Sequence, residues 1–110
     1  MPRVFVPQIP SRYDTNAGAW MPTVNIDPAK KFGELKVMLP PEANRLEIVS
    51  IVSVLKRMMK DYRPEDYVVA LGDPTIIAIA AVLAERAAGS LRLLKWDRIE
   101  REYVLMEVTL

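Results

Sequence analysis

The sequence predicts an α/β fold, a two- or three-layer domain in which a mixed sheet of about five to six strands carries two main helices, with hairpins at both ends. Short apolar runs rich in β-branched residues alternate with longer segments of helical periodicity. Between residues 67 and 96, one such run, a helix-length segment and another run follow without a linker, which is the order of a βαβ unit. Short polar turns near both ends of the chain indicate the hairpins.

The composition limits the chemistry that the chain can perform. Its 110 residues are expected to form a single α/β domain, residues 1–110. The chain has no cysteine and no histidine, so disulfides, thiolate metal sites and imidazole catalysis are excluded. We expect no cofactor, no metal and no enzymatic activity, because nothing pairs a nucleophile with a base. Fifteen basic and 14 acidic residues give a net charge of +1, which does not by itself indicate a nucleic-acid binder.

The sequence also bears on localisation. The N-terminal stretch MPRVFVPQIP lacks the long apolar core of a signal peptide. The most apolar segment, Ile76–Ala88, is too short to span a bilayer. We therefore expect a cytoplasmic protein that has no membrane partner.

The first elements are a strand and a returning strand. Arg3–Ile9 has the apolar residues of a strand, but Pro7 and Pro10 cannot donate to a ladder, so we expect this strand at an edge of the sheet. Tyr13–Gly18 has turn chemistry, with an aspartate near its start and a glycine at its end. Ala19–Ile26 is expected to return as the second strand.

The middle of the chain predicts a strand followed by a helix. Asp27–Gly33 is expected to be a loop or short turn, and Glu34–Leu39 a strand that a pair of prolines ends. From Pro41–Asn44 the chain is expected to lead into a helix that runs to about Tyr62. Apolar residues repeat in this helix at three-four spacing.

The stretch from Tyr67 to Gly89 is expected to organise the fold. Tyr67–Leu71 is a continuous apolar run, typical of a strand covered on both faces. Asp73 has the position of an N-cap, and Pro74 that of the first helical residue. Gly89 has the position after the helix where a left-handed conformation is needed. We therefore expect the strands before and after this helix to be parallel, with a right-handed crossover between them.

The C-terminal segment predicts an antiparallel hairpin. Leu91–Trp96 and Glu102–Leu110 are strand-like, and the turn Asp97–Arg101 between them is short. The last strand is too apolar for a solvated edge, since Glu107 is its only charge after Glu102. We therefore expect it to pair either with the N-terminal strand or with a partner chain.

An internal pattern occurs at both ends of the chain. It consists of an aromatic residue, an aspartate, five further residues and a second aromatic: Tyr13-Asp14 with Trp20, and Trp96-Asp97 with Tyr103. Hairpin chemistry explains it, with the aspartate opening the turn and the two aromatics facing each other across the ladder. Duplication or a binding motif is the alternative.

Several strings of the chain resemble small uncharacterised proteins encoded in tailed-phage genomes. They are VALGDP, the Ala/Ile-rich helix after it, LLKWDR with the following Tyr103, and, near the N-terminus, VFVPQIP with the hairpin and FGEL after it. The resemblance implies a phage protein made in the bacterial host cytoplasm that acts on a host or phage component. It carries no known activity, so it assigns no functional residue.

One candidate ligand site is the turn with Gly72, Asp73 and Thr75, because it follows a buried strand and opens a helix. It lacks the glycines and the lysine of a phosphate-binding loop, and capping is sufficient to explain Asp73. Glu65 and Asp66 lie at the other end of the same strand, too far from Asp73 to share a metal ion. We expect these two residues to be solvated turn acids.

A second candidate is an interaction surface made of aromatic, cationic and methionine side chains. Its residues are Met58, Met59, Trp20, Lys95, Trp96, Arg98, Arg101 and Tyr103. Cations beside aromatics are typical of nucleic-acid and peptide surfaces. Acidic residues interleave with them in the C-terminal hairpin, so an ordinary salt-bridged hairpin is the competing interpretation.

These observations favour a non-catalytic phage-type accessory or regulatory protein that acts by protein–protein binding or self-association. One alternative is a small-ligand or nucleotide binder at the turn with Gly72, Asp73 and Thr75. The other is a nucleic-acid-binding module that uses the Lys95–Tyr103 hairpin.

Overall fold

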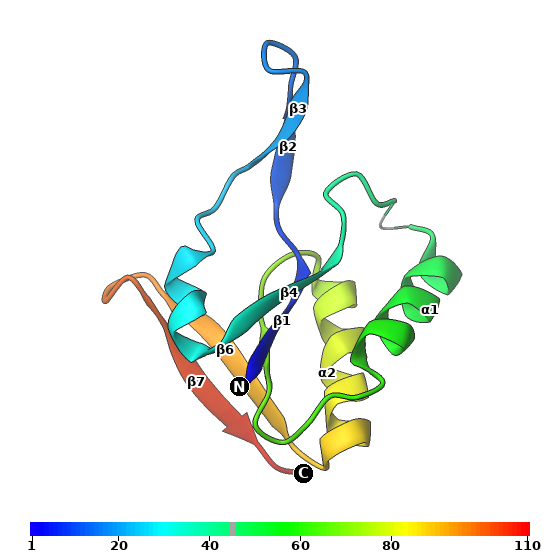
Figure 1. The fold of residues 1–110 in the computed structure, drawn as a ribbon, viewed down its shortest axis with the longest axis vertical. Coiled ribbons are helices and arrows are strands. Elements are labelled where there is room, and N and C mark those ends of the chain that lie inside the picture. The colour runs from blue at the N-terminus through cyan, green and yellow to red at the C-terminus, as the bar shows by residue number, and fades with distance from the viewer. Residues whose placement is uncertain (45) are drawn as a thin grey trace.

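The fold is centred on a five-stranded sheet with the strand order β4-β1-β5-β6-β7, as the computed structural model shows (Figure 1). The structure describes residues 1–44 and 46–110. Its elements are β1 (Arg3–Gln8), β2 (Ser11–Asp14), β3 (Ala19–Pro22), the 3₁₀ helix η1 (Asp27–Phe32), β4 (Glu34–Leu39), α1 (Ile48–Met59), β5 (Tyr67–Val69), α2 (Pro74–Ala88), β6 (Leu91–Asp97) and β7 (Glu102–Val108).

The sheet is mixed, as predicted. β4, β1, β5 and β6 are parallel neighbours, and β7 runs antiparallel to β6. The carboxyl ends of the parallel strands lie together at one end of the sheet. Open α/β sheets bind ligands at this end. The predicted α/β fold, with its two main helices and its hairpins at both ends, is confirmed.

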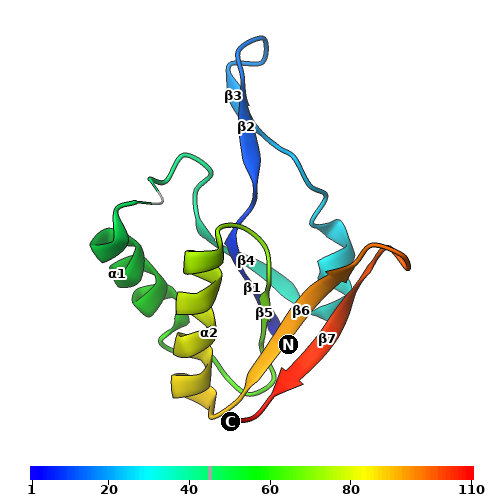
Figure 2. The same cartoon turned by 180° about the vertical axis from the view of Figure 1, so that it is seen from behind.

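Two apolar layers cover the sheet. On one face α1 and α2 lie side by side (Figure 2) and pack on Phe5, Met38 and Val68. On the other face η1 packs its Ala29 against a cluster that includes Val4. Adjacent residues of one strand therefore serve opposite layers, as the period of two in a strand requires. Among the helices that the structure describes, none is long and apolar enough to cross a membrane.

The first strand is not at an edge, contrary to the prediction from its prolines. β1 lies between β4 and β5. Its pairing with β5 covers only Val4 and Phe5, so Pro7 lies beyond the end of that ladder. A proline that needs to donate no hydrogen bond to a neighbour is compatible with an inner strand.

The N-terminal hairpin stands apart from the main sheet. The predicted return strand Ala19–Ile26 ends at Pro22, and β3 pairs with the additional strand β2 rather than with β1. The N–H of Thr23 donates to the Pro10 carbonyl at 2.8 Å and closes the base of the hairpin. The hairpin extends away from the body of the molecule (Figure 1). We call residues 11–22 the arm.

The caps of α2 are as predicted. The Asp73 carboxylate accepts a hydrogen bond from the N–H of Thr75 at 2.9 Å, and Pro74 begins the helix. Gly89 ends it in a left-handed conformation with φ 76°. α1 is shorter than predicted, because it begins at Ile48 and ends before Tyr62. Part of its predicted approach, Arg45, lies outside the described residues.

Gly33 joins η1 to β4 where the chain passes close to its own N-terminus. A Cβ at this position would lie 2.2 Å from the carbonyl oxygen of Pro2, and that same oxygen accepts from the Glu34 N–H at 3.0 Å. Gly33→Ala therefore has to displace backbone, and we expect it to lower the free energy of unfolding by about 2 kcal/mol. Urea denaturation measures this. Ser90→Ala, at a half-buried position after α2, should change it far less, and equal losses would contradict the close contact.

Candidate protein-binding site

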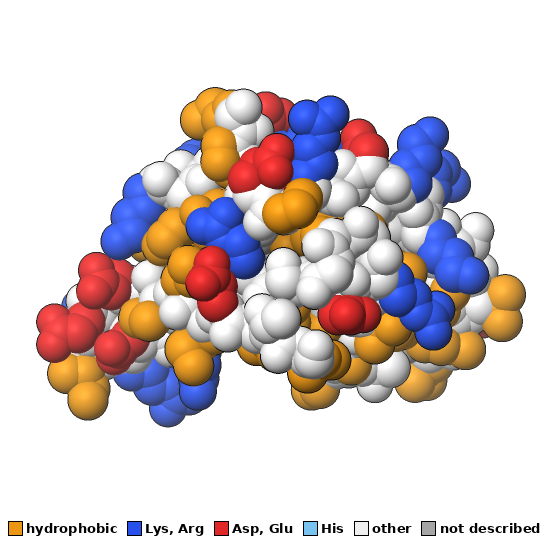
Figure 3. Space-filling model, turned by 90° about the horizontal axis from the view of Figure 1, so that it is seen from below, with side chains coloured by type: hydrophobic (Ala, Val, Ile, Leu, Met, Phe, Trp, Pro, Cys, Tyr) orange, Lys and Arg blue, Asp and Glu red, His pale blue; other side chains and the backbone are white. Residues whose placement is uncertain are grey.

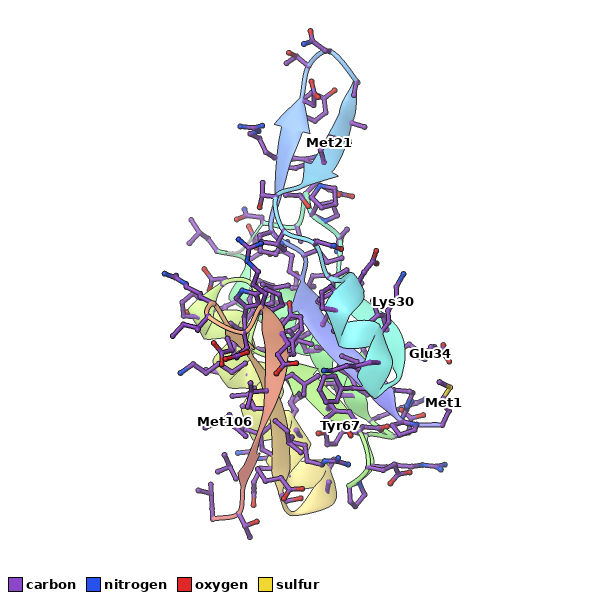
Figure 4. The ribbon with its side chains drawn as sticks, turned by 90° about the vertical axis from the view of Figure 1, so that its left-hand side faces the viewer. Met1, Met21, Lys30, Glu34, Tyr67 and Met106 are labelled. Carbon is purple, nitrogen blue, oxygen red and sulfur yellow. The ribbon has the colours of Figure 1, made fainter. Side chains whose placement is uncertain are left out.

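The arm carries large apolar side chains that the chain itself leaves exposed. Tyr13 is 50% exposed, Trp20 41% and Met21 46%. Tyr13 and Trp20 face each other across the ladder with their ring centroids 5.7 Å apart. In Figure 4 the labelled Met21 lies on the arm, well away from the residues labelled on the body. The arm thus presents apolar surface that no other part of the described chain covers.

The two hairpins have the same construction, as their shared sequence pattern predicts. Asp14 accepts hydrogen bonds from the N–H groups of Asn16 and Ala17 at 2.9 and 3.3 Å. Asp97 does the same for the residues at the equivalent positions, Ile99 and Glu100. The second aromatic pair, Trp96 with Tyr103, also stacks edge to face, with 5.0 Å between the ring centroids. The prediction of turn-opening aspartates and facing aromatics is confirmed.

A pocket of about 470 Å³ lies where the arm rejoins the body. Its walls come from the segment after the arm, from η1, from the segment after β5 and from the C-terminal hairpin. They are Val24, Asn25, Pro28, Leu71, Trp96, Arg101 and Tyr103. Its walls are mainly apolar, with a guanidinium, an amide and a phenol among them. Burial raises the pKa of the Tyr103 phenol. A side chain or small apolar group of a bound molecule would fit this hollow.

The turn predicted as a ligand site does not line this pocket, although Leu71 just before it does. Gly72 packs against β1, since a Cβ there would lie 3.0 Å from the Gln8 carbonyl oxygen. The Asp73 carboxylate occupies the Thr75 N–H that an anion would need. The geometry of this turn is that of a helix cap and a backbone contact.

Asp66 is not a solvated turn acid, contrary to expectation. It is 1% exposed and accepts hydrogen bonds from the backbone N–H of Arg3 at 2.8 Å, the Arg3 guanidinium at 2.9 Å and the N–H of Arg63 at 2.9 Å. Arg3 also pairs with the exposed Asp61 at 3.2 Å, and this hydrogen bond holds the pKa of that carboxyl below its ordinary value. Asp66 therefore ties the start of β1 to the start of β5. Glu65 beside it is exposed, as predicted.

The structure separates the residues of the predicted interaction surface. Met59 and Tyr103 are buried, so they cannot form part of an exposed surface, because each fills one of the two apolar layers. Met58 is half-buried and packs against the helical layer. The exposed members on the C-terminal hairpin are Lys95, Trp96, Arg98 and Arg101. Trp20 lies on the arm, so these residues do not form one continuous patch.

The charge pattern bears on the nucleic-acid alternative. Lys31 of η1 pairs with Glu102 of β7 at 3.5 Å, and Arg92 of β6 pairs with Glu107 at 3.6 Å. On the face seen in Figure 3, basic and acidic side chains are interspersed. Strong binding to a nucleic-acid backbone needs a field of one sign, so these features do not favour it. No group of three histidine, cysteine or acidic residues that could hold a metal ion occurs within the described ranges.

Comparison with known proteins places the chain in a family. A family model described as "Phage Pam3 gp32-like protein" matches residues 2–110. The chain belongs to this family. The predicted resemblance to phage-encoded proteins is confirmed, and it extends over nearly the whole chain. No curated protein and no solved structure matches it.

For this Pam3 gp32-like chain, sequence reasoning missed Tyr13 and Met21 as exposed apolar residues. A signal was present, because Pro10 precedes the arm and Pro22 ends it, and a proline cannot donate to the ladder of a larger sheet. The segment also lacks the alternation of polar and apolar residues that a half-buried strand shows. The pocket could not be found in this way, since its walls come together only through the topology.

Proposed function

We propose that the chain is a non-catalytic phage accessory protein that binds a protein partner through the arm. The observation that carries the proposal is the exposure of Tyr13, Trp20 and Met21 on a hairpin that extends away from the body. An isolated two-stranded hairpin is at best marginally stable in water. Exposed aromatic side chains on such an element are typical of the residues that dominate binding energy in protein interfaces.

The pocket at the base of the arm supports the same proposal. Val24 and Asn25 of its wall lie two and three residues after the arm in sequence. A partner that covers the arm would reach this hollow without crossing other structure, and could fill it with an apolar side chain. We infer a partner that has an apolar groove for the arm aromatics and a projecting side chain for the pocket.

The proposal predicts that the arm matters for binding and little for stability. Met21→Glu places a charge on the arm and leaves the Tyr13–Trp20 pair in place. We expect the free energy of unfolding to change by less than about 0.5 kcal/mol, because Met21 is 46% exposed and belongs to neither apolar layer of the sheet. Capture by tagged protein from phage-infected cells, read by quantitative mass spectrometry, should lose the partner with Met21→Glu and with Trp20→Ser.

The matched control is Asn16→Ala at the exposed tip of the arm. It should retain the partner. Because apolar contacts dominate the proposed interface, the partner should also remain bound at about 0.5 M salt, where surface charge attraction is largely screened. Capture of the same proteins by all variants would refute the arm as the binding site, and capture that collapses with salt would favour a nucleic-acid-mediated association.

A further inference from the structure

β7 leaves one side of its backbone unpaired. It is the outer strand of the five-stranded sheet and, among the described residues, pairs only with β6, not with the N-terminal strand as one prediction had it. Figure 1 shows β7 at the left margin of the molecule, and Figure 4, which looks onto that side, shows it in front. The edge is therefore open to another chain.

The backbone groups that face outward follow from the ladder. The N–H of Ala70 donates to the Leu94 carbonyl, so the backbone groups of Leu94 point toward β5. Leu94 lies opposite Leu105 of β7, which makes this a non-hydrogen-bonded pair. The N–H and C=O of Leu105 consequently point away from the sheet. By alternation, those of Tyr103 and Glu107 point outward as well.

This edge lacks the features that usually prevent association. β7 holds an unbroken register with β6 from Val108 to Glu102, without a bulge, and it contains no proline. Val104 and Met106 are 38% and 47% exposed on the helical face. The opposite edge strand, β4, carries a lysine, Lys36, whereas β7 contains none. An apolar, regular edge is a template for a further strand.

We propose that two copies of this chain pair through β7, antiparallel and with Leu105 opposite Leu105 of the second copy. Tyr103 then faces Glu107 of the other copy. Each of the three residues with outward backbone groups then faces a residue of the second copy whose backbone groups also point outward. Each facing pair exchanges two hydrogen bonds. The contact is isologous and closes, so it forms a dimer with a continuous sheet rather than a fibre.

The charges of β7 fit this register. Glu102 faces Val108 of the second copy, so no like charges are opposed. A symmetric pairing centred on Glu107 instead of Leu105 would place Glu107 opposite Glu107 of the second copy, which is unfavourable. On the helical face, Val104 and Met106 of the two copies become neighbours. Both line an open hollow of about 490 Å³ that a paired strand would cover.

Arg101 supplies a complementary charge. It has φ 55°, a conformation that the arm hairpin gives to Gly18 at the equivalent position with φ 62°. Arg101 lines the pocket on the η1 face, and alternation places Glu107 on that face too. In the proposed pairing, Arg101 lies diagonally across from Glu107 of the second copy, within reach of a long side chain. The structure records no ion pair of Arg101 within the part of the chain that it describes.

The dimer does not depend on the proposed function of the arm, and sedimentation equilibrium of the purified full chain tests it alone. At about 100 μM the wild type should be mainly dimeric if the dissociation constant is micromolar. Glu107→Pro removes an outward N–H and places the proline ring at the contact, without breaking a hydrogen bond to β6. It should weaken dimerisation at least about tenfold. Glu107→Ala, which keeps the N–H, should weaken it less.

A charge pair tests the register and does not rely on proline. With Val104→Lys and Met106→Lys together, like charges face each other and the protein should be monomeric. With Val104→Glu and Met106→Lys, opposite charges face each other and the dimer should return. A wild type that stays monomeric, a dimer that Glu107→Pro leaves intact, or equal behaviour of the two charge variants would each overturn the proposal. A wild-type monomer would leave the edge to a different protein.

Discussion

Replacing Asp66 by alanine should lower the free energy of unfolding by about 3 kcal/mol, a large part of what a domain of this size has available. Asp66 is buried and accepts hydrogen bonds from two backbone N–H groups and from the Arg3 guanidinium. Alanine would leave these donors without their acceptor in a site that water scarcely reaches. The Arg3 side chain is 21% exposed, which keeps the expected loss at the lower end of the range for broken buried pairs.

Urea denaturation followed by tryptophan fluorescence measures this loss. The matched control is Asp61→Ala, because Asp61 pairs with the same guanidinium from an exposed position. It should leave the unfolding midpoint nearly unchanged. If both variants unfold at the same urea concentration, or if Asp66→Ala costs under about 1 kcal/mol, the buried carboxylate is not the anchor of the first strand.

The protein should lose about 2 kcal/mol of stability from pH 10 to pH 12 through Tyr62 alone. The Tyr62 hydroxyl is buried and donates to the Asp66 carbonyl at 2.9 Å. Burial raises the pKa of this phenol to about 12, against about 10 in an unfolded chain. Above pH 10 the unfolded chain therefore releases a proton that the folded chain still holds, and the free energy of unfolding falls.

Denaturation at a series of pH values between 8 and 12 checks this slope, and Tyr62→Phe is the control. The variant should be less stable than the wild type at pH 8, since the Asp66 carbonyl loses its donor, but it should lose less stability as the pH rises. Tyr103, whose pKa burial also raises, adds a smaller decline in both proteins. An alkaline slope that Tyr62→Phe leaves unchanged would contradict the burial of this hydroxyl in the folded state.

The parts of the fold that local chemistry decides could be predicted from the sequence. The cap at Asp73, the left-handed Gly89 and the two aspartate turns depend on residues within one or two turns of each other. The βαβ unit is similar, because one apolar strand, one helix and the next strand follow directly. Local hydrogen bonding and the handedness of the crossover leave few alternatives.

The parts that depend on distant partners could not be predicted. Pro7 suggests an edge strand, yet β1 is internal because β5 is short and its ladder ends before the proline. Asp66 has the sequence context of a turn acid, and only the approach of Arg3, 63 residues away, makes it a buried anchor. Met59 and Tyr103 were predicted to lie on an interaction surface, but the topology buries each of them in one of the two apolar layers.

The arm follows the same rule for the candidate site. Trp20 could be singled out from composition, since tryptophan is enriched among the residues that dominate binding energy in interfaces. Tyr13 and Met21 are exposed together with Trp20 because β2 and β3 do not join the main sheet. The pocket brings three segments together that are far apart in the sequence, so it required the structure.

Site-specific photocrosslinking in phage-infected cells tests the binding role of the arm most directly. A photoreactive phenylalanine analogue would replace Trp20 in one protein and Val82 in another, where Val82 is 50% exposed on helix α2 and Trp20 is 41% exposed. We expect a discrete crosslinked protein from position 20, lost when Met21→Glu is added, and none from position 82. No crosslink from position 20, or the same products from both positions, would contradict the proposal that the arm binds a protein partner.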